Sequence, residues 1–73
     1  MIAAVDANKS TGPCIVYWTG RQGLSVKAHT YCGTSVSAAD GVLQLPDTWI
    51  EFARVCVDCA VAVKRGEPVK LKP

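Results

Sequence analysis

The sequence lacks several features that would place it in a large class of proteins. Its 73 residues contain no apolar run of the roughly 18 residues that a membrane-spanning helix needs, and we expect no membrane contact. The first residues, MIAAVDANKST, have neither the basic start nor the apolar segment of a secretory signal, so we expect a cytoplasmic protein. The net charge is only +2, without the dense basic stripe of strongly nucleic-acid-seeking proteins.

The chain is also too short to bury a large core. A domain of this length buries only about 60% of its unfolded surface, and such domains commonly need a metal ion, disulfides or a partner. Apolar residues still make up 49% of the sequence, which excludes a wholly disordered chain. The unusual feature is a set of four cysteines with a single histidine. In a reducing compartment, closely spaced cysteines bind metal or do redox chemistry more often than they form structural disulfides.

The sequence divides into a lead-in, a domain and a tail. Residues 1–13 form the lead-in, which contains a short edge strand over 2–5 and ends in the breaker cluster Thr11-Gly12-Pro13. Residues 14–66 form the predicted domain. Residues 67–73 contain two prolines and form an extended, exposed tail.

A β-hairpin is predicted over residues 14–29, with its turn at 20–23, because glycines there accept a positive φ. Strand-forming residues precede this turn, and an alternation of apolar and polar residues follows it. In the register that such a turn sets, Tyr17 points toward the core and Trp18 points away from it.

The second half of the chain contains a short strand and a helix. Residues 42–45 predict a strand that Pro46 ends. The segment 49–55 fits either a strand that returns onto 42–45 as a second hairpin or a helix with a capping box. We favour the strand, because the cysteines that follow are best placed at the start of a helix over 56–65, with Gly66 as its C-cap residue.

The most informative pattern pairs His29-x-x-Cys32 with Cys56-x-x-Cys59. Two residues between the members of a pair let both side chains point at one ion from a tight turn. Four ligands close a tetrahedral structural zinc site, and thiolates with one imidazole suit Zn²⁺. The predicted ligands of one structural Zn²⁺ are therefore His29, Cys32, Cys56 and Cys59. Cys14, the cross-strand neighbour of His29 in the predicted register, is the alternative to the histidine.

The cysteines also fit three arrangements that contain no metal ion. Cys56 and Cys59 fit a thioredoxin-like redox pair, although 73 residues are too few for the fold that surrounds such a pair. Two disulfides in an exported protein are the second arrangement, and reduced thiols in an apolar core are the third.

The segments His29-Thr30-Tyr31-Cys32-Gly33 and Cys56-Val57-Asp58-Cys59 resemble the knuckle and the helix start of treble-clef or zinc-ribbon-like zinc fingers. The resemblance covers about residues 29–65 and extends to the compact zinc fingers of bacteriophages and their bacterial hosts. It implies a small α+β, treble-clef-like domain with a β-hairpin, a zinc knuckle, a second short hairpin and a C-terminal helix. The chain departs from the family in its first ligand, a histidine, and in Cys14, which lies outside the motif.

We expect a non-enzymatic binding module, because four protein ligands leave no coordination position for a catalytic water. The leading expectation is a protein partner that contacts Trp18, Arg21 and Lys27, since tryptophan and arginine are favoured interface anchors. The alternative is a nucleic-acid-binding zinc finger, such as a transcriptional or phage regulator, that contacts phosphates through C-terminal cations. Those cations are Lys64, Arg65, Lys70 and Lys72.

Overall fold

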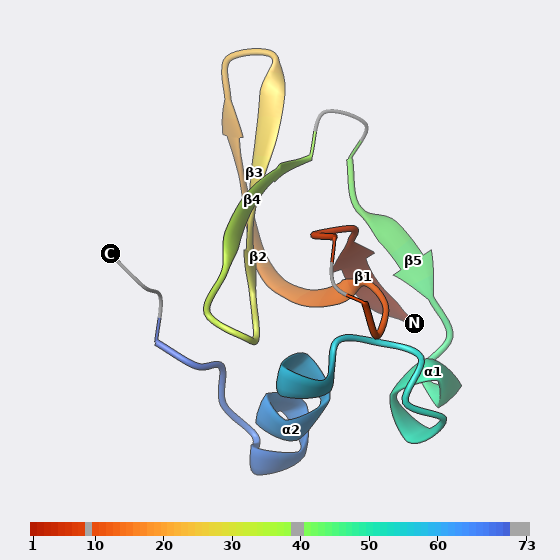
Figure 1. Cartoon of the computed structure of the whole chain (residues 1–73). Coiled ribbons are helices and arrows are strands. Elements are labelled where there is room, and N and C mark those ends of the chain that lie inside the picture. The colour runs from red at the N-terminus through yellow and green to blue at the C-terminus, as the bar shows by residue number, and fades with distance from the viewer. Residues whose placement is uncertain (9, 39–40, 71–73) are drawn as a thin grey trace.

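The computed structural model describes residues 1–8, 10–38 and 41–70 (Figure 1). The strands are β1 (Ile2–Val5), β2 (Cys14–Gln22), β3 (Ser25–Thr30), β4 (Ser35–Ala38) and β5 (Leu43–Leu45). The helices are α1 (Thr48–Glu51) and α2 (Val57–Arg65). An antiparallel sheet with a short helix makes this an α+β fold, the class that the sequence predicts. Neither helix of the described ranges has the length and hydropathy to span a bilayer.

The five strands form one curled sheet in the order β4-β3-β2-β1-β5 (Figure 1). Strand β2 connects the two parts of the sheet, because its first residues pair with β1 and its remaining residues pair with β3. The strand predicted over 2–5 is present, but it is not an edge strand. β1 lies between β2 and β5, and its Ala4 and Val5 are buried.

The hairpin of β2 and β3 has a different register from the predicted one. Its turn consists of Gly23 and Leu24, and Gln22 pairs with Ser25. Gly23 has a φ of 61° at the first position of this two-residue turn, where a type II′ turn requires a positive φ. The shorter turn shifts every cross-strand pair of the hairpin.

A β-bulge shifts the register again within this hairpin. Val16 pairs with Thr30 and Trp18 pairs with His29, so Tyr17 is the extra residue of β2. Because a bulge turns a side chain away from the regular alternation, Tyr17 and Trp18 are both exposed although they are adjacent in the chain.

The strand favoured for residues 49–55 is wrong, and so is the second hairpin that it would complete. The structure instead has α1, a single turn that begins after Asp47, and irregular backbone follows it. β5 pairs with β1 on one side, and residues 49–55 do not extend along its open edge but turn back on themselves, with Ala53 at a φ of 54°. The backbone therefore bonds locally, with the N–H of Phe52 donating to the carbonyl of Thr48.

Helix α2 agrees with the prediction for the end of the domain. Cys56 is its N-cap residue, and its last turn carries Lys64 and Arg65. Gly66 ends the helix in the left-handed conformation with a φ of 85°, which a residue without a Cβ adopts at little cost. The helix lies beneath the open end of the sheet, with its first turn beside the start of β2 (Figure 1).

Candidate metal centre

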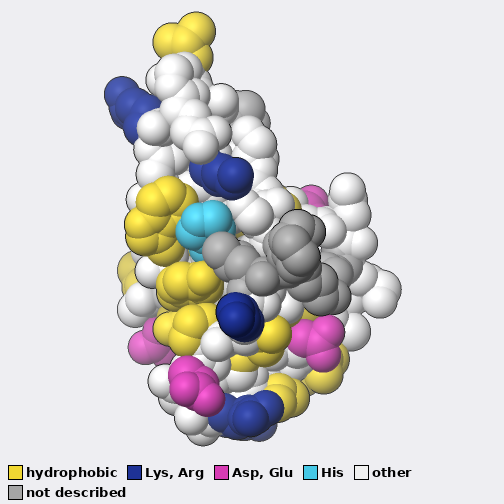
Figure 2. Space-filling model, turned by 90° about the vertical axis from the view of Figure 1, so that its left-hand side faces the viewer, with side chains coloured by type: hydrophobic (Ala, Val, Ile, Leu, Met, Phe, Trp, Pro, Cys, Tyr) yellow, Lys and Arg dark blue, Asp and Glu magenta, His cyan; other side chains and the backbone are white. Residues whose placement is uncertain are grey.

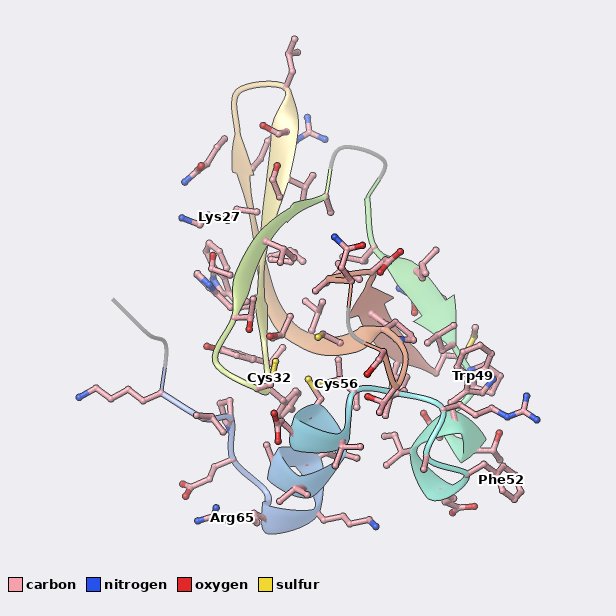
Figure 3. The ribbon with its side chains drawn as sticks, in the orientation of Figure 1. Lys27, Cys32, Trp49, Phe52, Cys56 and Arg65 are labelled. Carbon is pink, nitrogen blue, oxygen red and sulfur yellow. The ribbon has the colours of Figure 1, made fainter. Side chains whose placement is uncertain are left out.

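The structure brings four cysteines together from three parts of the chain. Cys14 begins β2, Cys32 lies in the turn between β3 and β4, and Cys56 and Cys59 lie at the start of α2. Their sulfur atoms all lie within 4.8 Å of one another, and none of the four forms a disulfide. Figure 3 shows Cys32 and Cys56 pointing toward the same space between the sheet and the helix.

These distances suit a tetrahedral metal ion. Zn–S bonds of about 2.3 Å at tetrahedral angles separate neighbouring sulfurs by about 3.8 Å. The Sγ atoms of Cys14 and Cys32 are 3.8 Å apart. The thiol donor set and its spacing therefore fit one ion bound by four cysteines.

The lead-in to β2 holds Cys14 beside the start of α2. The N–H of Cys56 donates to the carbonyl of Pro13 at 2.9 Å, and the N–H of Val57 donates to the hydroxyl of Thr11 at 3.3 Å. The latter bond satisfies one of the free amides of the helix N-terminus, which Cys56 does not cap through its own side chain. Two segments that lie far apart in the sequence are thus joined directly at the site.

Gly12 permits this close contact. Its φ is 133°, and a Cβ at this position would lie 2.3 Å from the carbonyl oxygen of Arg54. A side chain here would therefore collide with the backbone that precedes Cys56.

Cys32 is held by a small turn whose two threonines surround its sulfur. The Sγ of Cys32 lies 3.2 Å from the hydroxyl oxygen of Thr30 and 3.4 Å from that of Thr34. The turn is closed by the N–H of Thr30 donating to the carbonyl of Thr34 at 2.9 Å. Thr30 is fully buried, so the orientation of Cys32 is set by the core as well as by the turn.

The cysteines differ in their affinity for protons. Burial raises the pKa of the Cys14 thiol well above its ordinary value, and the nearby Cys59 adds to this rise. Burial also raises the pKa of Cys59 to about 12. Burial acts in the same direction on Cys32, but the hydroxyls of Thr30 and Thr34 favour its thiolate, and the balance lowers its pKa to about 6. Cys32 is therefore the natural first thiolate of the cluster.

Three of the cysteines are buried, and Cys32 is half-buried. Cys32 also lines an open groove of about 650 Å³, which runs past Arg65 to Val69 and Lys70. Because Cys32 alone among the four lines this groove, an ion would be reached from solvent past this residue.

His29 lies outside the cysteine cluster, so the structure favours the alternative set in which Cys14 takes its place. The bulge in β2 pairs His29 with Trp18, whereas Cys14 pairs with Val5 of β1. Since neighbouring residues of a strand point to opposite faces, the inward position of Thr30 directs His29 outward. The imidazole stacks on the indole of Trp18, with ring centroids 4.3 Å apart and planes at 25°.

The predicted partner-binding residues are only partly brought together. Trp18 and Lys27 share the outer face of the hairpin, but Arg21 pairs with Val26 and points to the other side. Lys64 and Arg65 lie at the end of α2, and Figure 3 places Arg65 far below Lys27. Lys70 follows in the tail, and the structure does not describe Lys72.

Comparisons with family models, curated proteins and solved structures find no match to this chain. The resemblance to treble-clef or zinc-ribbon-like fingers and to phage proteins therefore stays a prediction. The four-cysteine cluster is supported by the short distances between its sulfur atoms.

Proposed function

We propose that this chain is a non-enzymatic binding module whose fold is held together by one structural Zn²⁺. The observation that carries the proposal is the convergence of the sulfurs of Cys14, Cys32, Cys56 and Cys59 within 4.8 Å. Four thiols at this separation cannot all ionise without a nearby cation, because like charges raise one another's pKa. A divalent ion supplies that cation.

The donor set supports zinc in a structural role. Four cysteine thiolates in a tetrahedron are typical of structural zinc sites and of iron–sulfur proteins. With all four positions taken by protein, no position is left for a catalytic water. When bound, the ion supplies no chemistry to a substrate, and the cysteines use it to join the start of β2, the turn after β3 and the start of α2.

The position of the cluster explains why such an ion would matter to this fold. Three of the eight residues of the buried core cluster are cysteines, and its largest other members are one isoleucine and three valines: Ile15, Val5, Val16 and Val55. A core of this size contributes little burial, whereas structural zinc contributes about 10–16 kcal/mol of apparent binding free energy in zinc-finger peptides. The ion would therefore replace much of the hydrophobic interior that the chain lacks.

Native mass spectrometry of the purified chain, combined with metal analysis, tests this proposal. We expect one Zn²⁺ per chain and reduced cysteines, and Co²⁺ in its place should give the visible spectrum of a tetrahedral thiolate site. A coloured iron protein or a chain with two disulfides would contradict the proposal.

Two variants test the ligand set. Cys14→Ser is expected to weaken Zn²⁺ binding by more than about 100-fold, because even the loss of a group behind a metal ligand costs about 10–100-fold. His29→Asn is the matched control and is expected to keep one Zn²⁺ per chain. The opposite result, with zinc lost from His29→Asn and kept by Cys14→Ser, would restore the histidine as the fourth ligand.

A further inference from the structure

The outer face of the hairpin carries a row of exposed and half-exposed rings, which we call the aromatic face: Trp18, His29, Tyr17 and Tyr31. Trp18 stacks on His29, and Tyr17 lies on the same histidine with ring centroids 6.2 Å apart and planes at 29°. Tyr31 meets Tyr17 edge-on at 5.4 Å. In Figure 2 hydrophobic side chains lie to the left of and below the single histidine.

This face is held in place by the backbone. The indole of Trp18 lies over Gly20, where a Cβ would come within 2.3 Å of the ring. The bulge at Tyr17 puts a second large ring next to Trp18 on the same side of the sheet. Trp18 keeps 46% of its surface exposed and Tyr17 keeps 39%, so the rings are positioned but not covered by the described residues.

The hairpin and β4, which surround the rings, carry basic and small side chains but no acidic ones. Between Asp6 and Asp40 the sequence has no acidic residue. Lys27 shares the face of His29 two residues away on β3, and the neighbouring positions of β4 on that face are the exposed Ser35 and Ser37.

A second lysine lies at the other end of the row. The N–H of Val69 donates to the carbonyl of Tyr31 at 2.8 Å, which holds the tail against this turn and places Lys70 beside it. Among the described residues the only ion pair joins the N-terminal amine to Asp47, so neither lysine forms an ion pair with a described carboxylate. In Figure 2 basic side chains lie above and below the ring group, and acidic side chains also lie near the lower one.

We propose that the aromatic face binds single-stranded nucleic acid, with bases stacked on Trp18 and Tyr17 and phosphates near Lys27 and Lys70. This inference rests on the proposed binding-module function and names its partner. Exposed rings between cations are the combination that binds single strands without sequence preference, because every base has a face to stack. The hairpin and β4 contain no acidic side chain, so phosphates near Lys27 would meet no repulsion from them, whereas Asp58 and Glu67 line the groove beside Lys70.

A duplex fits this face less well than a single strand. Paired bases are stacked on one another and are not free to stack on a protein ring, so a duplex would use only the two lysines. A protein partner would use the rings as anchors but has no need for a hairpin without acidic residues. The charge pattern therefore favours the nucleic acid.

The test is fluorescence anisotropy of the zinc-loaded full chain with a labelled short oligothymidylate and with a duplex of the same length, over a series of salt concentrations. We expect tighter binding to the single strand. The logarithm of its affinity should fall with the logarithm of salt with a slope of about −1.4, since each of two phosphate contacts contributes about −0.7.

Four variants locate the binding surface. Trp18→Ala is expected to weaken binding about fivefold or more, and Trp18→Phe, which keeps a ring, should bind more tightly than Trp18→Ala. Lys27→Gln should bring the salt slope to about −0.7. As a control, Lys64→Gln removes a cation from the helix end and should bind like the wild type.

A fifth variant is the matched control for the loss of a ring. Phe52→Ala removes an aromatic residue that is 69% exposed on the far side of the molecule (Figure 3). It should bind the oligonucleotide like the wild type, because its ring lies away from the aromatic face.

The metal content and melting curve of each variant show whether a loss of binding comes from failure of the nucleic-acid inference or from loss of the zinc centre. A chain that holds one Zn²⁺ but binds no oligonucleotide, binds the duplex equally well, or is unaffected by Trp18→Ala overturns the nucleic-acid inference and leaves the zinc centre standing. Capture of a protein partner through Trp18 without oligonucleotide binding overturns it as well. A loss of binding in Lys64→Gln with none in Lys27→Gln would move the contact to the helix end and also contradict it.

Discussion

The two ends of the β2–β3 hairpin differ in what holds them. At its inner end, Cys14, Ile15 and Val16 are buried against the start of α2 and belong to the core cluster. At its outer end, from Tyr17 to Lys27, no residue is buried, and Leu24 at the tip is fully exposed. The inner end of the hairpin is thus held by the cysteine-rich core. The outer end, which we call the arm, is held by the backbone hydrogen bonds between its strands.

This difference shows where the stability of a very small domain is concentrated. Burial of apolar area contributes at the inner end only, where it coincides with the cysteine cluster. The arm depends on its inter-strand hydrogen bonds and a tight turn, so its side chains are free to bind a partner. Equivalent substitutions at the inner end and in the arm should therefore differ in their cost to stability.

Removal of the metal, which acts at the inner end, has the largest expected effect. Structural zinc contributes about 10–16 kcal/mol of apparent binding free energy in zinc-finger peptides, and whole domains are stable by about 5–15 kcal/mol. We expect strong chelation to unfold the chain, or to leave it molten, in circular dichroism melting experiments. A melting curve that does not change after complete metal removal would show that the inner end holds without the ion.

The glycines of the two ends give the next contrast. Gly12→Ala at the inner end should destabilise the fold by about 3 kcal/mol or more, because the new Cβ meets the Arg54 carbonyl at 2.3 Å in a left-handed conformation. Gly23→Ala at the tip of the arm also has a positive φ, of 61°, but meets nothing within 4 Å and should cost about 1 kcal/mol. Urea denaturation measures both, and equal losses would remove the distinction.

The smallest contrast concerns two exposed hydroxyls. Thr11→Val removes the acceptor of the Val57 N–H at the start of α2 and should cost about 1 kcal/mol. Ser25→Ala removes a bond from its hydroxyl to the carbonyl of Gln22 near the tip and should change the free energy of unfolding by less than about 0.5 kcal/mol. Thermal melts of the zinc-loaded proteins compare them, and a larger loss in Ser25→Ala would reverse the comparison.

Local patterns predicted those parts of the fold that depend on local interactions. The helix that follows Cys56 and ends at Gly66 was predictable from the residue types at its two ends. The strand over 2–5 and the strand near 42–45 were also predictable, although their pairing with each other was not. The segment 49–55 was predicted wrongly, because the expected pairing of this segment with 42–45 does not form and its backbone bonds locally instead.

The site was predicted in part for the same reason. Spacing alone selected Cys32, Cys56 and Cys59, but it also selected His29, since the pattern His-x-x-Cys does not reveal which face of its strand the histidine occupies. The threonines on either side of Cys32 and the glycine before Cys14 were missed as supporting residues. The pattern Thr-x-Cys-x-Thr and the breaker cluster before Cys14 were the only signals for them in the sequence.

The sequence by itself determined that this chain is a small α+β domain with too few apolar residues for a large core and with thiols that cluster at a helix start. Only the tertiary structure decided which four side chains meet. One extra residue at Tyr17 puts Val16 opposite the buried Thr30 and leaves Trp18 opposite His29 on the outer face, and the contact of Gly12 with Arg54 brings Cys14 to the helix. A bulge and a close backbone contact depend on strands that pair across the whole chain, and for that reason no local pattern reveals them.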